Sequence, residues 1–261
     1  MTIKIYNEDC IDTMNRMSIF DTKADIILTS PPYNTGRPSI SEKARDNNEA
    51  RYDMYFDTLT QNDYCDWCVD IFNHIDEILN KDGVILWNVS YGSDGTVNTA
   101  GIGLMWLSIA DIIRRTPFTT ADRIIWKKKS ALPNNVSKNK LTRIVEDVFV
   151  FCRKDEYKTF NCNKTVAGVS KKGQTIYNNY FNFIEAKNND GSCKLNKATY
   201  SSDLCKQLLS LYANEDSVVY DPFIGTGTTA VACKELGLTC YGSELSKDQV
   251  DYALERLKLK G

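Results

Sequence analysis

Residues 217–230 decide the fold, and they read SVVYDPFIGTGTTA. The apolar run at residues 218–220 predicts a buried strand, and the glycines that follow predict a tight turn leading into a helix that ends at Gly237. Glycines let a ligand approach the backbone closely, and the first turn of a helix offers unpaired N–H groups. The segment is therefore typical of a nucleotide-type cofactor site, although it lacks the full three-glycine dinucleotide fingerprint.

The next segment supports this interpretation. Residues 238–244 read LTCYGSE, which predicts a strand that ends in an acidic residue, Glu244. In doubly wound folds, an acid at the tip of the adjacent strand is where ribose hydroxyls are held. The alternative is that Glu244 is only a solvated surface charge.

A second stiff turn lies near the other end of the chain, where residues 25–34 read DIILTSPPYN. The apolar run predicts a buried strand, and the two prolines make its exit rigid because each fixes its own backbone torsion and lacks an N–H. The Ser30 hydroxyl and a proline carbonyl can accept hydrogen bonds from an exocyclic amine, and Tyr33 offers a ring face for stacking. The alternative is an ordinary exit from a strand into a loop.

The two turns together resemble the signature motifs of the S-adenosylmethionine-dependent DNA amino-methyltransferases, with TSPPY at residues 29–33 as the catalytic motif and DPFIGTGT at residues 221–228 as the cofactor loop. The catalytic motif comes first, which resembles the permuted beta group of that family. The resemblance covers nearly the whole chain and implies a Rossmann-like α/β fold with a mainly parallel seven-stranded sheet, circularly permuted. Further segments that resemble the family are residues 6–10, whose acid contacts the cofactor adenine in the family, and residues 78–87, 124–128 and 143–151.

This resemblance implies methyl transfer from S-adenosylmethionine to the exocyclic amino group of a flipped base in double-stranded DNA. Within the family a serine before Pro-Pro-Tyr is commoner for cytosine N4 and an aspartate for adenine N6, so Ser30 slightly favours cytosine N4, with adenine N6 as the alternative. Methylation at carbon 5 of cytosine is disfavoured, because none of the six prolines precedes a cysteine. A non-catalytic cofactor-binding or DNA-binding subunit, or a methyltransferase acting on RNA or on protein amides, stays open.

The site residues follow from matching the motifs position by position. The expected catalytic residues are Ser30, Pro31, Pro32 and Tyr33. The expected cofactor-binding residues are Asp9, Cys10, Ser30, Asp221, Pro222, Phe223, Gly225, Gly227, Thr228, Glu244 and Leu245. Residues 196–201 depart from the family's pattern, so a contact to the cofactor's methionine part through Thr199 or Ser201 is in doubt.

Length and cysteine content indicate one intracellular domain. A chain of 261 residues fits a single methyltransferase domain spanning residues 1–261. Its nine cysteines are scattered, and no apolar leader precedes them, so reduced thiols in the cytoplasm are expected. Cys65 and Cys68 form a C-x-x-C without a second pair at zinc spacing, so no metal is expected. No apolar run approaches the roughly 20 residues needed to cross a bilayer, so a soluble protein is expected.

The total charge is uninformative, because 32 basic residues stand against 34 acidic ones. A basic excess between Arg114 and Lys172 nevertheless suits phosphate contacts, with a solvated basic face as the alternative.

Residues 129–200 are expected to contain insertions used for DNA target recognition, and residues 35–57 form a candidate lid. A paired restriction endonuclease and a homodimer stay open as partners. The candidate DNA-binding residues are Arg37, Lys127, Lys128, Lys129, Lys138, Lys140 and Arg143.

Strand and helix patterns alternate along the chain, which predicts a mainly parallel sheet with helices on both faces. Because ligands bind at the carboxyl ends of parallel strands, Asp9, Ser30, Asp221 and Glu244 are expected to converge on one pocket. The predicted strands are residues 3–6, 25–28, 84–88, 123–126, 148–152, 218–220 and 240–242, and the predicted helices are residues 62–79, 103–115, 202–213 and 247–259.

Overall fold

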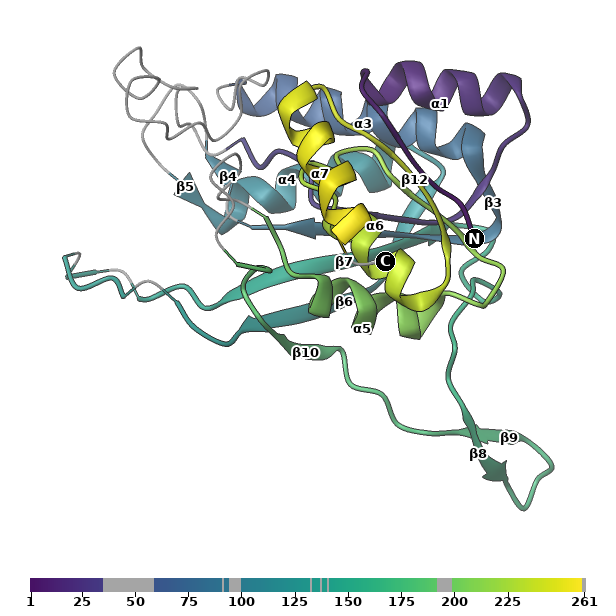
Figure 1. The fold of residues 1–261 in the computed structure, drawn as a ribbon. Coiled ribbons are helices and arrows are strands. Elements are labelled where there is room, and N and C mark those ends of the chain that lie inside the picture. Colours follow the sequence, from purple (N-terminus) through teal and green to yellow (C-terminus); the bar gives the residue numbers. More distant parts are fainter. Residues whose placement is uncertain are drawn as a thin grey trace, which may run out of the picture.

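A twisted eight-stranded sheet forms the centre of the molecule (Figure 1). The computed structural model describes residues 1–34, 59–90, 92–93, 100–131, 133–136, 138–139, 141–191 and 199–259. In order across the sheet, the strands are β1 (Ile3–Tyr6), β12 (Thr239–Ser243), β11 (Val218–Asp221), β2 (Ala24–Thr29), β3 (Leu79–Val89), β7 (Val145–Arg153), β6 (Phe118–Lys128) and β10 (Phe183–Ala186). Only β7 pairs antiparallel with its neighbours, so the sheet is mainly parallel.

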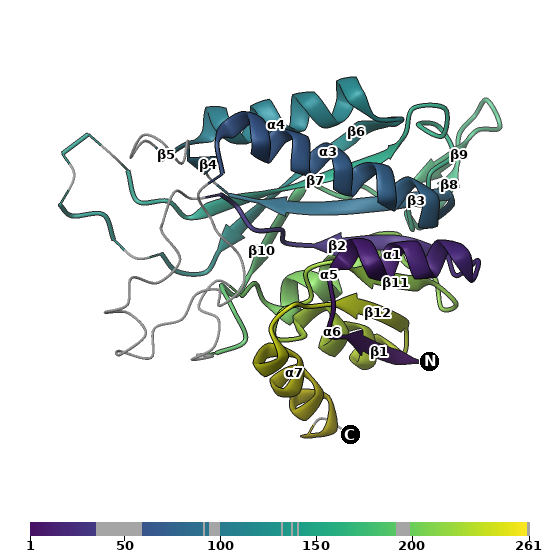
Figure 2. The ribbon, with the colours of Figure 1, turned by 90° about the horizontal axis from the view of Figure 1, so that it is seen from above.

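Helices cover both faces of this sheet (Figure 2). One face packs against α1 (Cys10–Ile19), α3 (Gln61–Ile78) and α4 (Ile102–Arg115). The other face packs mainly against α5 (Ser202–Tyr212) and α6 (Thr228–Leu236), while α7 (Lys247–Leu259) closes the chain. The two apolar clusters that result are separated by the sheet, as expected for a doubly wound α/β domain.

The first and last strands of the chain are neighbours, because β1 pairs in parallel with β12. The strand that carries the Ser-Pro-Pro-Tyr turn, β2, pairs directly with β11, which carries the glycine loop. The helix after β2 covers one face and the helix after β11 covers the other, so the chain switches faces between these two strands. A crevice for a ligand forms at such a switch point in open α/β sheets.

The sheet has one strand more than the seven that the sequence predicts. All seven predicted strands exist within the observed bounds, and the additional strand is β10, which pairs in parallel with β6 at the sheet edge. The sequence does not reveal β10 as a strand, because only two of its four residues, Ile184 and Ala186, are buried and no apolar run results. Helix α1 was also missed, although Asp9 caps it and Met14 and Met17 bury its inner face.

Two segments of the expected target-recognition region leave the sheet at opposite ends of its strands (Figures 1 and 2). The first, residues 129–144, connects β6 to β7 and has no helix or strand among its described residues. The second carries a small antiparallel hairpin of β8 (Val166–Val169) and β9 (Thr175–Tyr177) beyond the far end of β7. A further short pair, β4 (Gly92–Ser93) and β5 (Ala100–Gly101), lies between β3 and α4.

Several expectations fall on residues outside the described ranges. These are the candidate lid at residues 35–57, the candidate DNA contacts Arg37 and Lys140, and residues 196–198 of the departing segment. Over the described part of the chain, every helix is too short or too polar to cross a membrane.

Candidate active site

A cleft of about 930 Å³, including the part open to solvent, lies at the carboxyl ends of β1, β2, β11 and β12. Residues from both ends of the chain line it, so the two turns that the sequence singles out meet in one place. The expected site residues in its lining are Asp9, Cys10, Ser30, Pro32, Pro222, Phe223, Gly225, Thr228, Glu244 and Leu245.

Asp221 is not in the lining, because its carboxylate is turned into the protein between the two turns. Its Oδ1 accepts hydrogen bonds from the Thr29 hydroxyl at 2.6 Å and from the Phe223 N–H at 3.0 Å. Its Oδ2 accepts from the hydroxyls of Thr229 at 2.5 Å and Tyr200 at 3.2 Å. Asp221 therefore ties the catalytic strand to the glycine loop and holds the cleft together from behind.

Burial governs the ionisation of this carboxyl group. Asp221 is fully buried, and loss of hydration raises its pKa, while the hydrogen bonds from Thr229, Thr29, Phe223 and Tyr200 act in the opposite direction. Tyr200 is also buried, and burial together with the nearby Asp221 charge raises the pKa of its phenol. Tyr200 therefore stays protonated and donates to Asp221.

The amino end of α6 faces the cleft and is built around glycine. Gly227 is the N-cap residue with φ of 82°, and no side chain caps the helix there. An added Cβ at Gly227 would lie 2.7 Å from the Cβ of Ala253 in α7, so both its conformation and its neighbour require glycine. Gly227 is thus behind the lining, where it sets the path of the loop.

A buried polar atom in the cleft lacks a partner within the described structure. The Thr226 hydroxyl is buried, lines the cleft and makes no hydrogen bond to the residues described. Burying an unpaired hydroxyl is costly, so a polar ligand at this loop would relieve the cost. Together with the uncapped end of α6, this feature fits a nucleotide-type cofactor.

Glu244 follows β12, as the sequence predicts, and its carboxylate is held by the backbone. Oε2 accepts from the N–H of Gly225 at 3.1 Å, and Oε1 accepts from the N–H of Ser246 at 2.9 Å. These bonds fix the side chain in the lining of the cleft, beside the glycine loop. A carboxylate oxygen has two lone pairs, so a carboxylate at this position suits the hydroxyl hydrogens of a ligand.

At the other side of the cleft, Asp9 is the N-cap of α1. Its Oδ1 accepts from the Ile11 N–H at 2.8 Å. Cys10 follows within the first turn, where burial raises the pKa of its thiol. The Tyr220 hydroxyl donates to the Cys10 carbonyl at 3.3 Å, which anchors this turn to β11.

Helix α3 contributes an aromatic and apolar wall that the sequence pattern did not assign to the site. Trp67 and Ile71 line the cleft, and the Trp67 ring lies 5.4 Å from that of Phe223. The helical spacing of these residues indicated only a packed face. Thr199 also lines the cleft, whereas Ser201 is buried and caps α5 by accepting from the Leu204 N–H.

The Ser-Pro-Pro-Tyr turn is fixed on both sides. The Tyr64 hydroxyl of α3 donates to the Pro32 carbonyl at 2.8 Å, and the Asn34 side chain pairs with both backbone groups of Leu59. Within the turn, Ser30 Oγ lies 2.6 Å from the Tyr33 hydroxyl. Pro31 and Tyr33 are beside the cleft rather than in its lining.

The candidate DNA-binding residues divide by their surroundings. Lys127 pairs with Glu185 of β10 at 2.6 Å, and Lys128 pairs with Glu146 of β7 at 2.5 Å beside the Ser30 turn. Lys129, Lys138 and Arg143 are exposed in the segment between β6 and β7. Among the described candidates, the residues that are exposed as a whole therefore lie in that segment.

Fold and cleft together define a Rossmann-like methyltransferase. The DNA methylase family model N6_N4_Mtase matches residues 24–255, and the chain belongs to this family. It is an S-adenosylmethionine-dependent DNA amino-methyltransferase, as the sequence motifs indicate.

Relatives and solved structures agree with this assignment. Type II methyltransferase M.BglII of Bacillus subtilis is 26% identical over 97% of this chain and 68% of its own length. Orphan methyltransferase M.BamHII of Bacillus amyloliquefaciens is 25% identical over 92% of this chain and 91% of its own. The PvuII DNA methyltransferase (cytosine-N4-specific) shares the fold with a TM-score of 0.71 and 17% identity, covering 98% of this chain and 86% of that one.

Proposed function

We propose that this protein methylates the exocyclic amino group of a base that has been rotated out of double-stranded DNA, and that cytosine N4 is favoured over adenine N6. The observation that carries the proposal is the position of Ser30, which lines the same cleft as Gly225 and Glu244. A hydrogen-bond acceptor for the amine therefore stands beside the site for the methyl donor.

The residues of the turn suit an amine that is a poor nucleophile. The lone pair of an exocyclic amine is delocalised into the base ring. Ser30 Oγ and the Pro31 carbonyl would accept its hydrogens, which favours a tetrahedral nitrogen whose lone pair is free to attack. Tyr33 would stack on the base, which must leave the duplex to reach the turn. Holding the reacting groups in line supplies much of the rate acceleration.

The lining of the cleft suits S-adenosylmethionine, which supplies a methyl group on a positively charged sulfur when bound. Asp9 would contact the adenine, and Glu244 would accept the ribose hydroxyls. Trp67 and Phe223 provide apolar surface, and Thr226 and Thr199 offer hydroxyls. Asp221 and Gly227 are outside this lining and would support the site from behind.

The preference for cytosine rests on Ser30, because serine at this position of the motif is commoner for cytosine N4 in the family. The PvuII enzyme, whose name specifies cytosine N4, shares the fold. The two target amines are chemically similar, so adenine N6 remains the second candidate.

The duplex would bind at the edge of the sheet that carries Ser30. Residues 129–144 leave the sheet at this edge and expose Lys129, Lys138 and Arg143. The β8–β9 hairpin leaves at the opposite end of the strands, so within residues 129–200 the first segment is the better candidate for target recognition. We also propose a paired restriction endonuclease as a partner, which copurification tests. A homodimer is proposed as the oligomeric state, which sedimentation tests.

Transfer of radiolabelled methyl from S-adenosylmethionine to duplex DNA, RNA and protein, measured in parallel, tests the substrate class. The expected result is label in duplex DNA, released on digestion as N4-methylcytosine and identified by mass spectrometry. N6-methyladenine would overturn the cytosine preference. Label in RNA or protein alone, or no label at all, would overturn the proposed function.

A further inference from the structure

Four adjoining strands each place a polar side chain at the same edge and on the same face of the sheet. Residues two apart in a strand share a face of the sheet. On this face, each strand presents a row of apolar residues that ends in a polar residue at that edge. The three complete rows, read toward the edge, are Val84, Leu86, Asn88 in β3; Val150, Val148, Glu146 in β7; and Ile124, Trp126, Lys128 in β6. On β2, the row Ile26 and Leu28 continues to Ser30.

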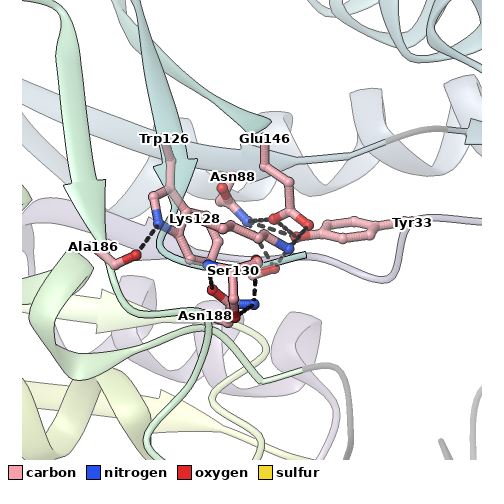
Figure 3. Close-up of polar contacts among 9 residues, drawn as sticks. Tyr33, Asn88, Trp126, Lys128, Ser130, Glu146, Ala186 and Asn188 are labelled. Atoms are coloured by element: carbon pink, nitrogen blue, oxygen red, sulfur yellow. Dashed lines mark hydrogen bonds and ion pairs between the residues drawn. The ribbon is translucent and has the colours of Figure 1, made fainter. Parts of the chain in front are cut away.

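These polar side chains contact one another (Figure 3). The Asn88 amide nitrogen donates to the Tyr33 hydroxyl at 2.6 Å, to Glu146 Oε2 at 3.2 Å and to Ser30 Oγ at 3.3 Å. The Tyr33 hydroxyl donates to Glu146 Oε2 at 3.4 Å. The Lys128 ammonium group donates to the other carboxylate oxygen of Glu146, Oε1, at 2.5 Å. Glu146 is thus joined to Ser30 through both Tyr33 and Asn88.

The carboxylate determines the direction of the hydrogen bonds. A carboxylate only accepts, so the hydroxyl hydrogen of Tyr33 is directed to Glu146. Either hydroxyl can donate in the 2.6 Å contact between Ser30 and Tyr33, and with the Tyr33 hydrogen directed to Glu146 the donor there is Ser30. Asn88 presents its nitrogen to all three oxygens, which share its two hydrogens, while its own Oδ1 is buried without a partner among the described residues. Ser30 lines the cleft, so in this arrangement its Oγ can accept from a ligand without its own hydrogen in the way.

We propose that Glu146 is a positioning residue for methyl transfer, which acts through Tyr33 and Asn88 to keep Ser30 Oγ an acceptor toward the target amine. This inference rests on the proposed function. With a neutral side chain at position 146, Tyr33 is free to donate to Ser30. The hydroxyl hydrogen of Ser30 then competes with the hydrogens of the amine, and fewer molecules hold the productive arrangement.

The ion pair between Lys127 and Glu185 shows what a merely structural pair looks like on the same strand. It joins β6 to β10, and its side chains are 41% and 45% exposed. The Glu146 side chain is 12% exposed, and its Oε2 is directed at Asn88 and Tyr33 rather than at solvent. The Glu146 carboxylate therefore has a connection to Ser30 that Glu185 lacks.

The test compares Glu146→Gln with the matched control Glu185→Gln in the full-length protein. We expect kcat on duplex DNA to fall about 10-fold or more in Glu146→Gln, because stabilising contacts at the reacting atoms are lost. The Kd values for S-adenosylmethionine and for DNA should stay within about twofold, as expected for an effect confined to the chemical step. Glu185→Gln should keep the kcat of the unmodified protein. Glu146→Asp, which retains the carboxylate, should recover part of the loss.

A further readout separates positioning from support of the fold. In the Tyr33→Phe background, which lacks one of the two connections, Glu146→Gln should lower kcat by a smaller factor than in the unmodified protein. An unchanged kcat in Glu146→Gln, or an equal factor in both backgrounds, would overturn the inference. Failure of the proposed function is distinguishable, because the unmodified protein would then methylate no DNA.

Discussion

Ser30 makes the contact on which methyl transfer depends, so its hydroxyl can be tested alone. We expect Ser30→Ala to lower kcat by about 100-fold or more, in line with the loss of one hydrogen-bonding group at a reacting centre. The Kd for S-adenosylmethionine, measured by calorimetry, should change little because the rest of the cleft lining is intact. Ser210→Ala is the control, since that exposed hydroxyl bonds only within α5. Loss of the fold in Ser30→Ala would mean that the position is structural.

At the level of single residues, sequence reasoning found the groups that belong to local motifs. Ser30 and Glu244 were recognisable because each follows a short apolar run. Asn88 and Glu146 were not, and Lys128 was assigned only to DNA binding, because their place in this cluster depends on which strands become neighbours. The available signal was a polar residue two positions beyond an apolar one in each strand, and this signal has meaning only once β3, β7 and β6 are known to be adjacent.

Helix α6 offers a test at the level of an element, because glycine occupies a left-handed conformation at both of its ends. Gly227 and Gly237 have φ values of 82° and 76°. A Cβ at Gly227 would meet Ala253 at 2.7 Å, whereas a Cβ at Gly237 meets nothing within 4 Å. Gly237→Ala should therefore lower the free energy of unfolding by about 1–2 kcal/mol through backbone strain alone.

Gly227→Ala combines that strain with overpacking against α7, so we expect a loss of about 2–5 kcal/mol. It should also weaken S-adenosylmethionine binding, since a displaced α6 moves the amino end that faces the cleft. Urea unfolding and calorimetry of the two variants measure both effects. Equal losses of stability and unchanged cofactor affinity in both variants would contradict the role given to Gly227.

The elements themselves were largely predictable, and the exceptions have physical reasons. Strong apolar runs located the seven strands that are buried in the sheet centre or at its β1 edge. The edge strand β10 was missed because exposed Phe183 and Glu185 interrupt its buried residues. Residues 80–83, which separate the predicted helix from the predicted strand, lie within the bounds of β3, where Asp82 has φ of 60° and the pairing with β2 shifts register.

On the scale of the whole molecule, Asp221 links two motifs that are almost two hundred residues apart, and its ionisation makes that link sensitive to pH. Burial raises its folded-state pKa above the unfolded value of about 3.9. The folded state then holds the proton to higher pH than the unfolded state does. The resulting stabilisation is complete below the unfolded pKa and is lost as pH rises through the folded pKa.

Asp221→Asn removes this dependence. The free energy of unfolding of the unmodified protein minus that of the variant should therefore decrease as pH is raised from about 4 toward neutrality. Urea unfolding at a series of pH values measures the difference. A difference that increases with pH would show that the donors Thr29, Thr229, Tyr200 and Phe223 outweigh burial and lower the pKa.

The placement of the two extensions at opposite ends of the strands predicts where DNA binds. Counterion release makes DNA affinity fall with salt, and each lost phosphate contact reduces the slope of log Kd against log salt by about 1. Lys129→Gln and Lys138→Gln, near the Ser30 edge, should each reduce that slope. Lys171→Gln and Lys172→Gln remove the same charge from the turn of the β8–β9 hairpin and should leave it unchanged. Fluorescence anisotropy with a labelled duplex measures the slopes. The opposite pattern would place the duplex at the hairpin, which lies at the other end of the strands from Ser30.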